Sequence, residues 1–239
     1  GSSFVEVGRD HNITVGDNRP DCDLKNAVWW DHDTDGDADL YVAGRKCHAF
    51  YENTGGGFVD ATQRIFGSIL PPERPEVFTA GVEDFNQDGN EDLYLGRWDQ
   101  QDYILINQGD ESVVLRGREF GLDMAIGDDP LENTMGLGIG DIYDDGYPDI
   151  LIGTGNPSTP VRDLLFCNDQ GRRFYRCGDT LHLKTGPNDK TRGHGVAFAD
   201  IDHDGDTDLF INLGGHPGYD HGFFHHVTSA SENESRQVS

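Results

Sequence analysis

The sequence predicts an all-β fold, a β-propeller of four four-stranded blades, on three observations. A nine-residue acidic motif, DHDTDGDAD at residues 31–39, recurs at 84–92, 141–149 and 200–208. The copies start 53, 57 and 59 residues apart, and a period in this range marks stacked supersecondary units. Glycine accounts for 32 of the 239 residues, about twice its average usage, which indicates many tight turns.

Each repeat reads as four strands, with the acidic motif between the first and the second. The first strand interleaves small residues, as in MGLGIG at 135–140, which permits close approach at a crowded axis. An apolar strand follows the motif, then a strand that ends in asparagine in three repeats, then a fourth strand after a glycine-containing turn. These patterns place the blades at about 22–60, 76–117, 133–177 and 192–228 of a single domain, residues 1–239.

The two ends of the chain suggest how the ring closes. FVEV at 4–7 matches the fourth strand of the first repeat, so we expect this N-terminal strand to complete the last blade. Residues 229–239 are polar and are expected to form a flexible tail. Four blades is the lower limit of the usual range, and a part of a larger ring would start in the same way.

The acidic motif has the spacing with which a tight loop directs alternate oxygen atoms at one hard cation. Ca²⁺ takes about 6–8 oxygen ligands, and a glycine at position six allows the sharp turn. The loop is not an EF-hand, because its last acidic residue falls at position nine instead of twelve and a strand follows it. A single such motif could also be a solvated acidic turn, but four copies favour metal binding.

The predicted ligands are the side chains at positions one, three, five and nine and the backbone carbonyl at position seven. They are Asp31, Asp33, Asp35, Asp37 and Asp39; Asp84, Asn86, Asp88, Asn90 and Asp92; Asp141, Asp145, Tyr147 and Asp149; and Asp200, Asp202, Asp204, Asp206 and Asp208. Tyr143 takes position three of the third loop, so that site is expected to be the weakest or empty. The sequence therefore predicts three to four Ca²⁺ ions, which stabilise the fold.

Charge and cysteine content restrict the class of protein. The net charge of -26 argues against nucleic acid and anionic membrane surfaces as partners, and no apolar segment approaches the ~20 residues of a membrane span. Four cysteines suit two disulfides, and the strand order brings Cys22 near Cys47 and Cys167 near Cys177, although composition alone allows three pairings. We expect a secreted or extracytoplasmic protein, a monomer or homodimer, whose leader is absent because the opening GSS resembles an expression scar.

The strand order also predicts a loop-rich face opposite the acidic loops, and such faces commonly bind partners. The candidate ligand-binding residues on it are Arg97, Trp98, Arg192, His194, His216 and Tyr219. Cations beside two aromatic rings suit an anionic or sugar-like ligand, or an extracellular protein. The alternative is that these long loops are polar only because they are solvated.

Histidine supports a second hypothesis, an enzyme. His194, His216, Tyr219 and His221 are candidate catalytic residues for proton abstraction and return in a lyase or cyclase. His216, His221, His225 and His226 with Asp220 also suit a transition metal. The sequence has no nucleophile motif, phosphate loop or dinucleotide fingerprint that would define an enzyme class further.

The repeated D-x-[DN]-x-D-G-x-x-D followed by an apolar strand resembles the FG-GAP/VCBS repeats of integrin α-type propellers. GHGVAFADIDHDGDTDLFINLGGHPGYD at 193–220 is similar to the closing repeat of secreted proteins of the ASPIC/UnbV kind. The resemblance implies a calcium-binding propeller with roles in adhesion or glycan binding, and lyase chemistry in more distant members. The chain departs from the family pattern in having four repeats where seven are usual and in lacking the segment that follows the last repeat.

Overall fold

The computed structural model describes residues 3–15, 21–67, 69–70, 75–98, 100–122, 133–154, 163–177, 193–213 and 222–224. These residues form four antiparallel sheets, one for each acidic motif, and the strands of each sheet follow one another in chain order. Three sheets have four strands and the described part of the last has three. The all-β prediction of four-stranded units is thus confirmed.

The strands fall where the periodicity predicts them. The first sheet holds β1 (Leu24–Trp30), β2 (Asp39–Gly44), β3 (Ala49–Asn53) and β4 (Phe58–Asp60); the second holds β5 (Val77–Glu83), β6 (Asp92–Arg97), β7 (Tyr103–Asn107) and β8 (Val113–Arg116). The third holds β9 (Thr134–Gly140), β10 (Asp149–Thr154), β11 (Leu164–Asn168) and β12 (Phe174–Arg176), and the fourth holds β13 (Gly193–Ala199), β14 (Asp208–Leu213) and β15 (Gly222–Phe224). In the described residues, three short helices lie outside the sheets: η1 (Arg9–His11), α1 (Thr62–Phe66) and η2 (Arg118–Phe120).

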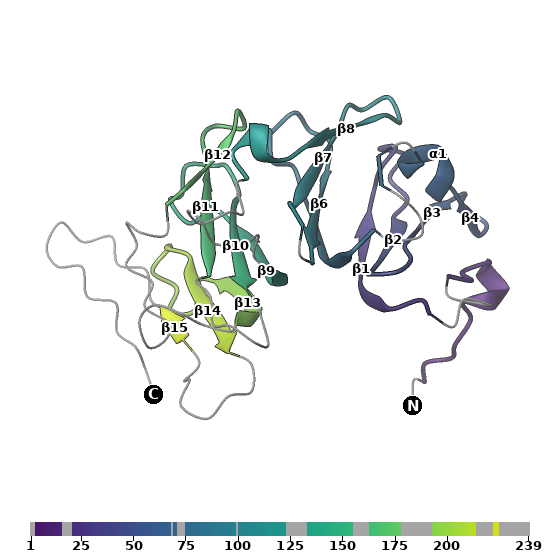
Figure 1. Ribbon diagram of the computed structural model, residues 1–239, viewed down its shortest axis with the longest axis horizontal. Helices are drawn as coiled ribbons and strands as arrows, with labels where there is room; N and C mark the ends of the chain where they lie inside the picture. The colour runs from purple at the N-terminus through teal and green to yellow at the C-terminus, as the bar shows by residue number, and fades with distance from the viewer. Residues whose placement is uncertain are drawn as a thin grey trace, which may run out of the picture.

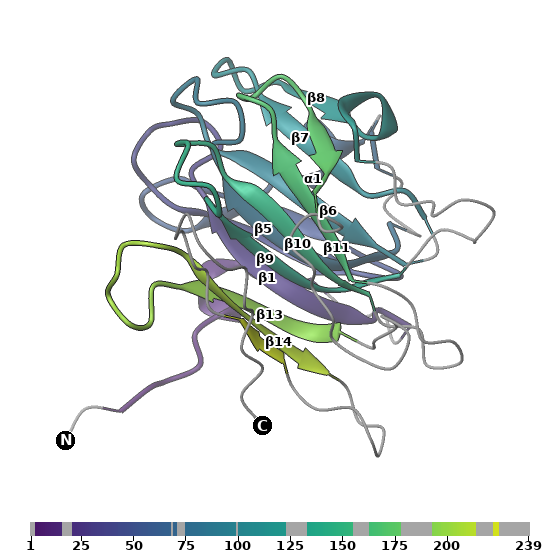
Figure 2. The same cartoon turned by 90° about the vertical axis from the view of Figure 1, so that its left-hand side faces the viewer.

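The four sheets are arranged in an arc, as propeller blades are (Figure 1). The first strands β1, β5, β9 and β13 pack side by side in that order along its inner side, and Figure 2 shows them from one end. The acidic loops of the second and third sheets border one groove, so they lie at the same end of their sheets. The acidic loops thus share one end of the molecule, and the connections from second to third strand share the other.

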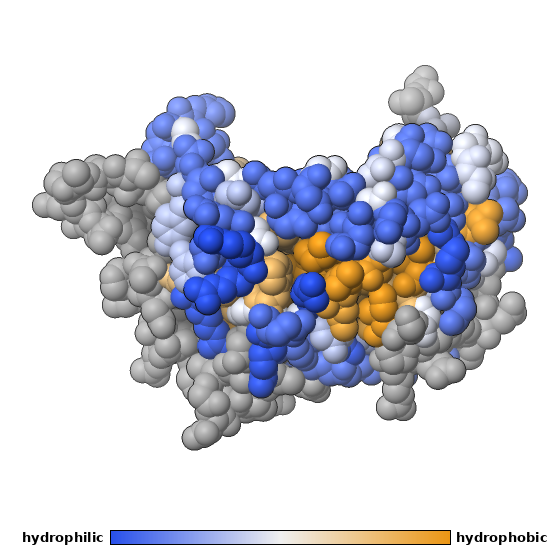
Figure 3. Space-filling view, turned by 90° about the horizontal axis from the view of Figure 1, so that it is seen from above, coloured by the Kyte–Doolittle hydropathy of each residue, from blue (hydrophilic) through white to orange (hydrophobic). Residues whose placement is uncertain are grey.

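Apolar side chains fill each seam between neighbouring sheets. Trp30 of β1 and Leu93 of β6 belong to the core of the first seam, Tyr94 and Phe174 to that of the second, and Ile142 with other apolar side chains to that of the third. Viewed from the side of β8 and β12, apolar residues reach the surface between hydrophilic side chains (Figure 3). Burial of these apolar faces is the main force that holds the arc together.

Small residues on the first strands allow the sheets to approach one another, as the sequence predicts. A Cβ atom at Gly81 of β5 would lie 2.6 Å from Cδ1 of Ile139 on β9, and one at Gly138 would lie 2.6 Å from Cγ1 of Val196 on β13. Contacts this short would force a neighbour to move, so only glycine leaves room for the bulky side chain of the next sheet. At each of these positions, a bulky side chain on one first strand packs on a glycine of the preceding first strand.

The predicted closure by an N-terminal strand is wrong. Residues 4–7 form no strand, and Phe4 and Val5 are exposed. The N-terminal segment lies beside the first sheet, at the opposite end of the arc from β15 (Figure 1). Ile13 and Val15 instead pack against the cluster of Val42, Ala49 and Tyr51 on the outward face of that sheet. FVEV offers too little apolar surface to offset the cost of ordering a strand so far from the rest of the segment.

Both predicted disulfides are present. Cys22, ahead of β1, is bonded to Cys47 in the β2–β3 connection, and Cys167 on β11 is bonded to Cys177 just after β12. Their Cα–Cα distances of 5.3 and 5.8 Å are ordinary for disulfides. Because disulfides persist in oxidising compartments, the two bonds indicate an extracytoplasmic location. In the described part of the chain, no helix has the length and apolar character that a membrane span requires.

Candidate metal centres and the loop-rich face

The four acidic loops, residues 31–39, 84–92, 141–149 and 200–208, share one backbone design. In each loop, the Asp at position one accepts a hydrogen bond from the N–H of the glycine at position six, at 2.7 to 3.2 Å. The Asp at position five accepts from the N–H of residue seven, at 2.8 to 3.0 Å. The glycine has a φ near +90° in every loop, for example +90° at Gly36, a conformation in which a side chain would be strained.

The Asp at position nine is buried in all four loops and ties the loop to the sheet. Asp92 shows the pattern, because its Oδ2 accepts from the N–H of Phe85 at 3.1 Å and its Oδ1 accepts from the N–H of Asn107 at 2.8 Å. Burial raises the pKa of Asp92 to about 7, and that of Asp39 and Asp149 to about 6. These carboxylates therefore hold the loop on the sheet by hydrogen bonds and are also candidate ligands. The spacing of the motif alone does not reveal the first of these two roles.

Two loops bring three carboxylates together. Oxygen atoms of Asp31, Asp33 and Asp35 lie within 4.8 Å of one another in the first loop, and those of Asp200, Asp202 and Asp208 do so in the fourth. Such clusters of hard oxygen donors fit Ca²⁺, because the ion neutralises charges that otherwise repel. Among the described residues, no third group of this kind occurs.

The second and third loops differ in ways that follow from their sequences. In the second loop, the amides of Asn86 and Asn90 donate to Asp88 at 2.8 and 2.9 Å, so neutral groups already surround this carboxylate. In the third loop, Tyr143 at position three is 42% exposed and supplies no carboxylate. The groove between these two loops is about 520 Å³ in volume, and the charged residues that line it are Glu83, Asp84 and Asp141. It suits cations and repels anions.

Asparagine links neighbouring sheets at the acidic end. The side-chain amide of Asn107 donates to the carbonyl of His32 in the preceding sheet at 2.8 Å, and Asn168 does the same to Phe85 at 2.8 Å. His32 and Phe85 both hold position two of their loops, and both side chains are buried in the seam. The asparagine that ends the third strand is the sequence signal for this link, which sequence reasoning noticed without assigning a role.

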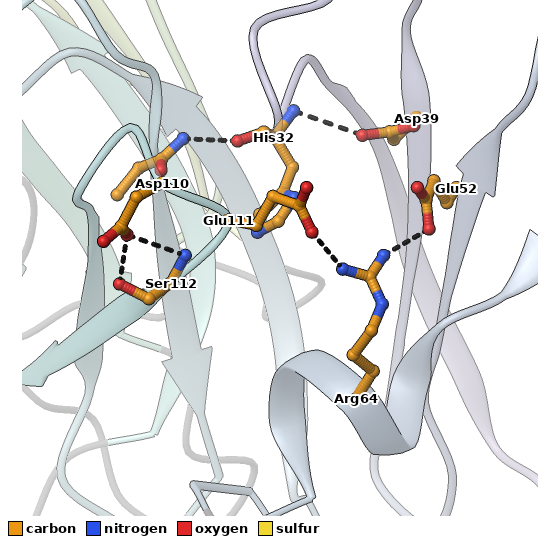
Figure 4. Close-up of polar contacts among 8 residues, drawn as sticks. His32, Asp39, Glu52, Arg64, Asp110, Glu111 and Ser112 are labelled. Carbon is orange, nitrogen blue, oxygen red and sulfur yellow. Dashed lines mark hydrogen bonds and ion pairs between the residues drawn. The ribbon is translucent and has the colours of Figure 1, made fainter.

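An ion-pair network reinforces the first seam beside His32 (Figure 4). Arg64 on α1 contacts Glu52 of the first sheet and donates to Glu111 of the second sheet at 2.8 Å. The ring of His32 packs edge-on against Trp30 and Phe50, and neither ring nitrogen has a hydrogen-bond partner within the described part of the chain. Burial, aided by the charge of Arg64, lowers the pKa of His32, so the neutral ring serves as an apolar plug.

At the opposite end, the loop-rich face carries a row of alternating cations and aromatic rings. The guanidinium of Arg45 lies 4.8 Å from the ring centroid of Trp98, Phe78 lies 5.6 Å from the same ring, and the ammonium of Lys25 lies 5.3 Å from Phe78. We call Lys25, Arg45, Phe78 and Trp98 the cation–aromatic row. Their side chains are partly exposed, and the cations also meet Asp23 and Glu76.

The predicted ligand-binding residues have different positions on this face. Trp98 belongs to the cation–aromatic row, but Arg97 is buried, donates to the Pro75 carbonyl at 3.1 Å and packs over Tyr103. Arg97 therefore packs beneath the loop-rich face and is not part of its exposed surface. His194 is exposed on β13. The remaining candidates lie outside the described residues, as do the histidines of the transition-metal hypothesis; they are Arg192, His216, Tyr219, Asp220, His221, His225 and His226.

A buried carboxylate on this face has no counterpart in the sequence predictions. Asp102 accepts hydrogen bonds from the hydroxyls of Tyr94 and Thr134, each at 2.5 Å, and from the N–H of Arg97 at 2.7 Å. Thr134 comes from the third sheet, so Asp102 joins two sheets. Burial raises its pKa to about 7, even though the three hydrogen bonds and Arg97 act in the opposite direction.

Comparison with known proteins agrees with the repeat assignment. Residues 141–211, which include the third and fourth acidic loops, match the family model described as FG-GAP-like repeat, so the predicted resemblance is confirmed over this stretch. The curated proteins contain no match to the chain. Among solved structures, it is similar to the rhamnogalacturonan lyase YesW, with a TM-score of 0.46 and 14% identity over 80% of this chain and 40% of that chain. The chain thus spans about two fifths of the length of that lyase.

Proposed function

We propose that this protein is an extracellular, calcium-stabilised module of propeller blades that recognises a glycan or a protein ligand. The observation that carries the proposal is the hydrogen-bond design that all four acidic loops share, with three carboxylates gathered in each of the first and fourth loops. A loop that holds like charges together in a fixed geometry is preorganised for a cation. The two disulfides support an extracellular setting, where calcium is abundant enough to fill weak sites.

Calcium in this proposal has a structural role. Asp31, Asp33 and Asp35 would hold one ion and Asp200, Asp202 and Asp208 another, each across the junction of the first two strands of a sheet. The amide-rich second loop and the Tyr143 substitution in the third predict weaker sites. The ions would supply charge neutralisation, and the residues of the loops already hold the backbone in place.

The cation–aromatic row is the part of the loop-rich face best suited to recognition. The guanidinium of Arg45 covers one face of the Trp98 ring. A sugar ring would therefore stack on the parts of the Trp98 and Phe78 rings that remain exposed. Arg45 and Lys25 would meet an acidic group of the ligand by exchanging their contacts with Asp23 and Glu76. His194, Arg192, His216 and Tyr219 remain proposed contributors to the same face.

Calcium titration tests the metal part of the proposal. Isothermal titration of the metal-free protein should give at least two strong sites, and Asp33→Ala should remove one of them. Asp144→Ala is the matched control, because Asp144 is acidic and lies in an acidic loop but not at a ligand position. No calcium binding at millimolar concentrations would overturn this part.

An array of acidic glycans and extracellular proteins tests recognition, with calcium-loaded protein as the probe. Binding that Arg45→Ala and Trp98→Ala weaken about tenfold or more, while Arg172→Ala leaves it unchanged, would support the proposed face. Arg172 is the control because it is a cation on the β11–β12 turn, away from the row. Binding that survives both substitutions would move the ligand site elsewhere.

A further inference from the structure

The first acidic loop differs from the other three at its position-one Asp. In the second, third and fourth loops, Oδ1 of this Asp accepts a hydrogen bond from the N–H of residue five, at 3.1 to 3.2 Å. In the first loop, the N–H of Asp35 donates to Asp33 at 3.3 Å. Oδ1 of Asp31 is buried and has no hydrogen-bond partner in the described part of the chain. The first loop thus leaves unpaired an oxygen atom that the other loops bond internally.

A buried carboxylate oxygen without a partner is unfavourable, because water no longer solvates it. A divalent cation would supply the missing partner, since Ca²⁺ binds carboxylate oxygens. Oxygen atoms of Asp31, Asp33 and Asp35 already gather within 4.8 Å of one another. The unpaired oxygen of Asp31 therefore fits a cation site in the first loop.

Asp31 is held in place by a residue of the next sheet. Its N–H donates to Oε2 of Glu91 at 3.2 Å, and Glu91 directly precedes the position-nine Asp92 of the second loop. The indole N–H of Trp30 donates to the carbonyl of Glu91 at 2.8 Å. Because the side chain of Trp30 is fully buried in the first seam, this bond fixes the backbone of Glu91 beside Asp31. Glu91 thus reaches the first loop across the seam.

Glu91 holds position eight of its loop, which is not a ligand position in the motif. The other loops have Ala38, Pro148 and Thr207 there, so only the second loop has an acidic residue at this position. Its carboxylate adds a further negative charge beside Asp31, and like charges this close repel unless a cation is present. The arrangement is therefore favourable when the first loop holds a cation and unfavourable when it does not.

We propose that Glu91 is a positioning residue for the cation site of the first loop. It fixes the backbone of Asp31 from the second sheet, so that the unpaired Oδ1 is oriented for the ion at little entropic cost. This inference rests on the calcium binding of the proposed function. Because coupling between two equilibria is reciprocal, the contact between Glu91 and Asp31 is stronger when the site is filled. Calcium in the first loop therefore also stabilises the seam between the first and second sheets.

Calcium titration of a chain in which the fourth site is weakened tests the proposal. In an Asp200→Asn background, the remaining strong site is that of the first loop. Glu91→Ala should raise its Kd about tenfold or more, as loss of an outer partner of a metal ligand does. Glu91→Gln should leave it nearly unchanged, because the amide oxygen still accepts from the N–H of Asp31. Glu83→Ala is the matched control, since it removes a charge from the same loop but its carboxylate accepts from Asp84, at 3.2 Å.

The titration separates this proposal from the calcium proposal. A chain with Asp200→Asn that binds no calcium strongly would overturn both. Strong binding that Glu91→Ala weakens no more than Glu83→Ala would overturn only the role of Glu91. A loss that Glu91→Gln shares in full would also overturn it, because the charge of Glu91 would then matter and its hydrogen bond to Asp31 would not.

A double-mutant cycle distinguishes positioning from a general structural role. Urea unfolding in saturating calcium measures the free energy lost on Glu91→Ala in the unchanged chain and in a chain with Asp33→Ala, which lacks the first site. The loss should be larger in the unchanged chain, because only there does Glu91 act on a filled site. Equal losses would mean that Glu91 merely joins the two sheets, which would overturn the proposal.

Discussion

The two ends of the sheets follow opposite rules. At the acidic end, the same hydrogen bonds recur in four loops, from the position-one Asp to the position-six glycine in each. At the loop-rich end, different contacts join the sheets at different seams. The cation–aromatic row lies between the first and second sheets, and the hydrogen bond from Thr134 to Asp102 joins the second and third. Ion coordination tolerates little variation, so the acidic end repeats. The other end is free to vary, and varied surfaces are where specific recognition develops.

Calcium removal tests the comparison with the largest expected effect. A site at a hundredfold excess of calcium over its Kd stabilises the fold by about 2.7 kcal/mol, so loss of two sites should cost about 5 kcal/mol. For a chain of this size that corresponds to a fall in melting temperature of roughly 10–20 °C. Calorimetry with and without a chelator measures the shift, and re-addition of calcium should restore it. An unchanged melting temperature would show that the acidic end does not depend on metal.

At the loop-rich end, Asp102 predicts a pH dependence of smaller size. Its pKa is about 7 in the fold and about 3.9 in an unfolded chain, so the folded state retains the proton more strongly. The contribution to stability is fully present below about pH 4, falls as pH rises toward 7, and is lost above that. Asp102→Asn cannot ionise and should remove this component.

Urea unfolding of both proteins in saturating calcium measures it. The free energy of unfolding of Asp102→Asn should gain on that of the unchanged protein by roughly a few kcal/mol between pH 5 and pH 8. Calcium-dependent effects of pH cancel in the difference because both proteins have the same acidic loops. A difference that does not vary with pH would mean that Asp102 is ionised throughout.

The smallest expected effect concerns the link between sheets at the acidic end. Asn107→Ala removes the bond to the His32 carbonyl and leaves a buried acceptor unpaired, at a cost of about 1–3 kcal/mol. Thr54→Ala is the matched control, because the hydroxyl of Thr54 donates to the Gly57 carbonyl within the turn of a single sheet and is exposed. Urea unfolding should show a larger loss for Asn107→Ala, and equal losses would argue against a special role for the seam.

The sheets could be predicted from the sequence because the same residue pattern recurs in every repeat. The acidic loop, the apolar strand and the terminal asparagine recur at fixed positions, so that one reading supports the others. The disulfide partners followed from strand order in the same way. The N-terminal strand failed because its single match, FVEV to FVDAT, had no repetition behind it, and a short apolar pattern fits many positions.

The candidate sites were predicted unevenly. The metal ligands could be named because each lies within nine consecutive residues, but the burial of the position-nine Asp depends on residues some fifteen places away. The cation–aromatic row joins Lys25 and Arg45 of the first sheet to Phe78 and Trp98 of the second. No local pattern could pair these residues, because the contact exists only across a seam.

The sequence by itself determined the number of repeats, the spacing of the acidic loop that suits a hard cation, and the cysteines that form the disulfides. These features are local, and local geometry follows from the spacing of residue types along the chain. Only the tertiary structure decided how the sheets meet. It brought Asp102 within hydrogen-bond distance of Thr134 and placed the guanidinium of Arg45 over the ring of Trp98. It also left Trp29 of the first sheet and Ile201 of the fourth exposed. Packing between sheets depends on shape across long separations in sequence, which no pattern within one repeat encodes.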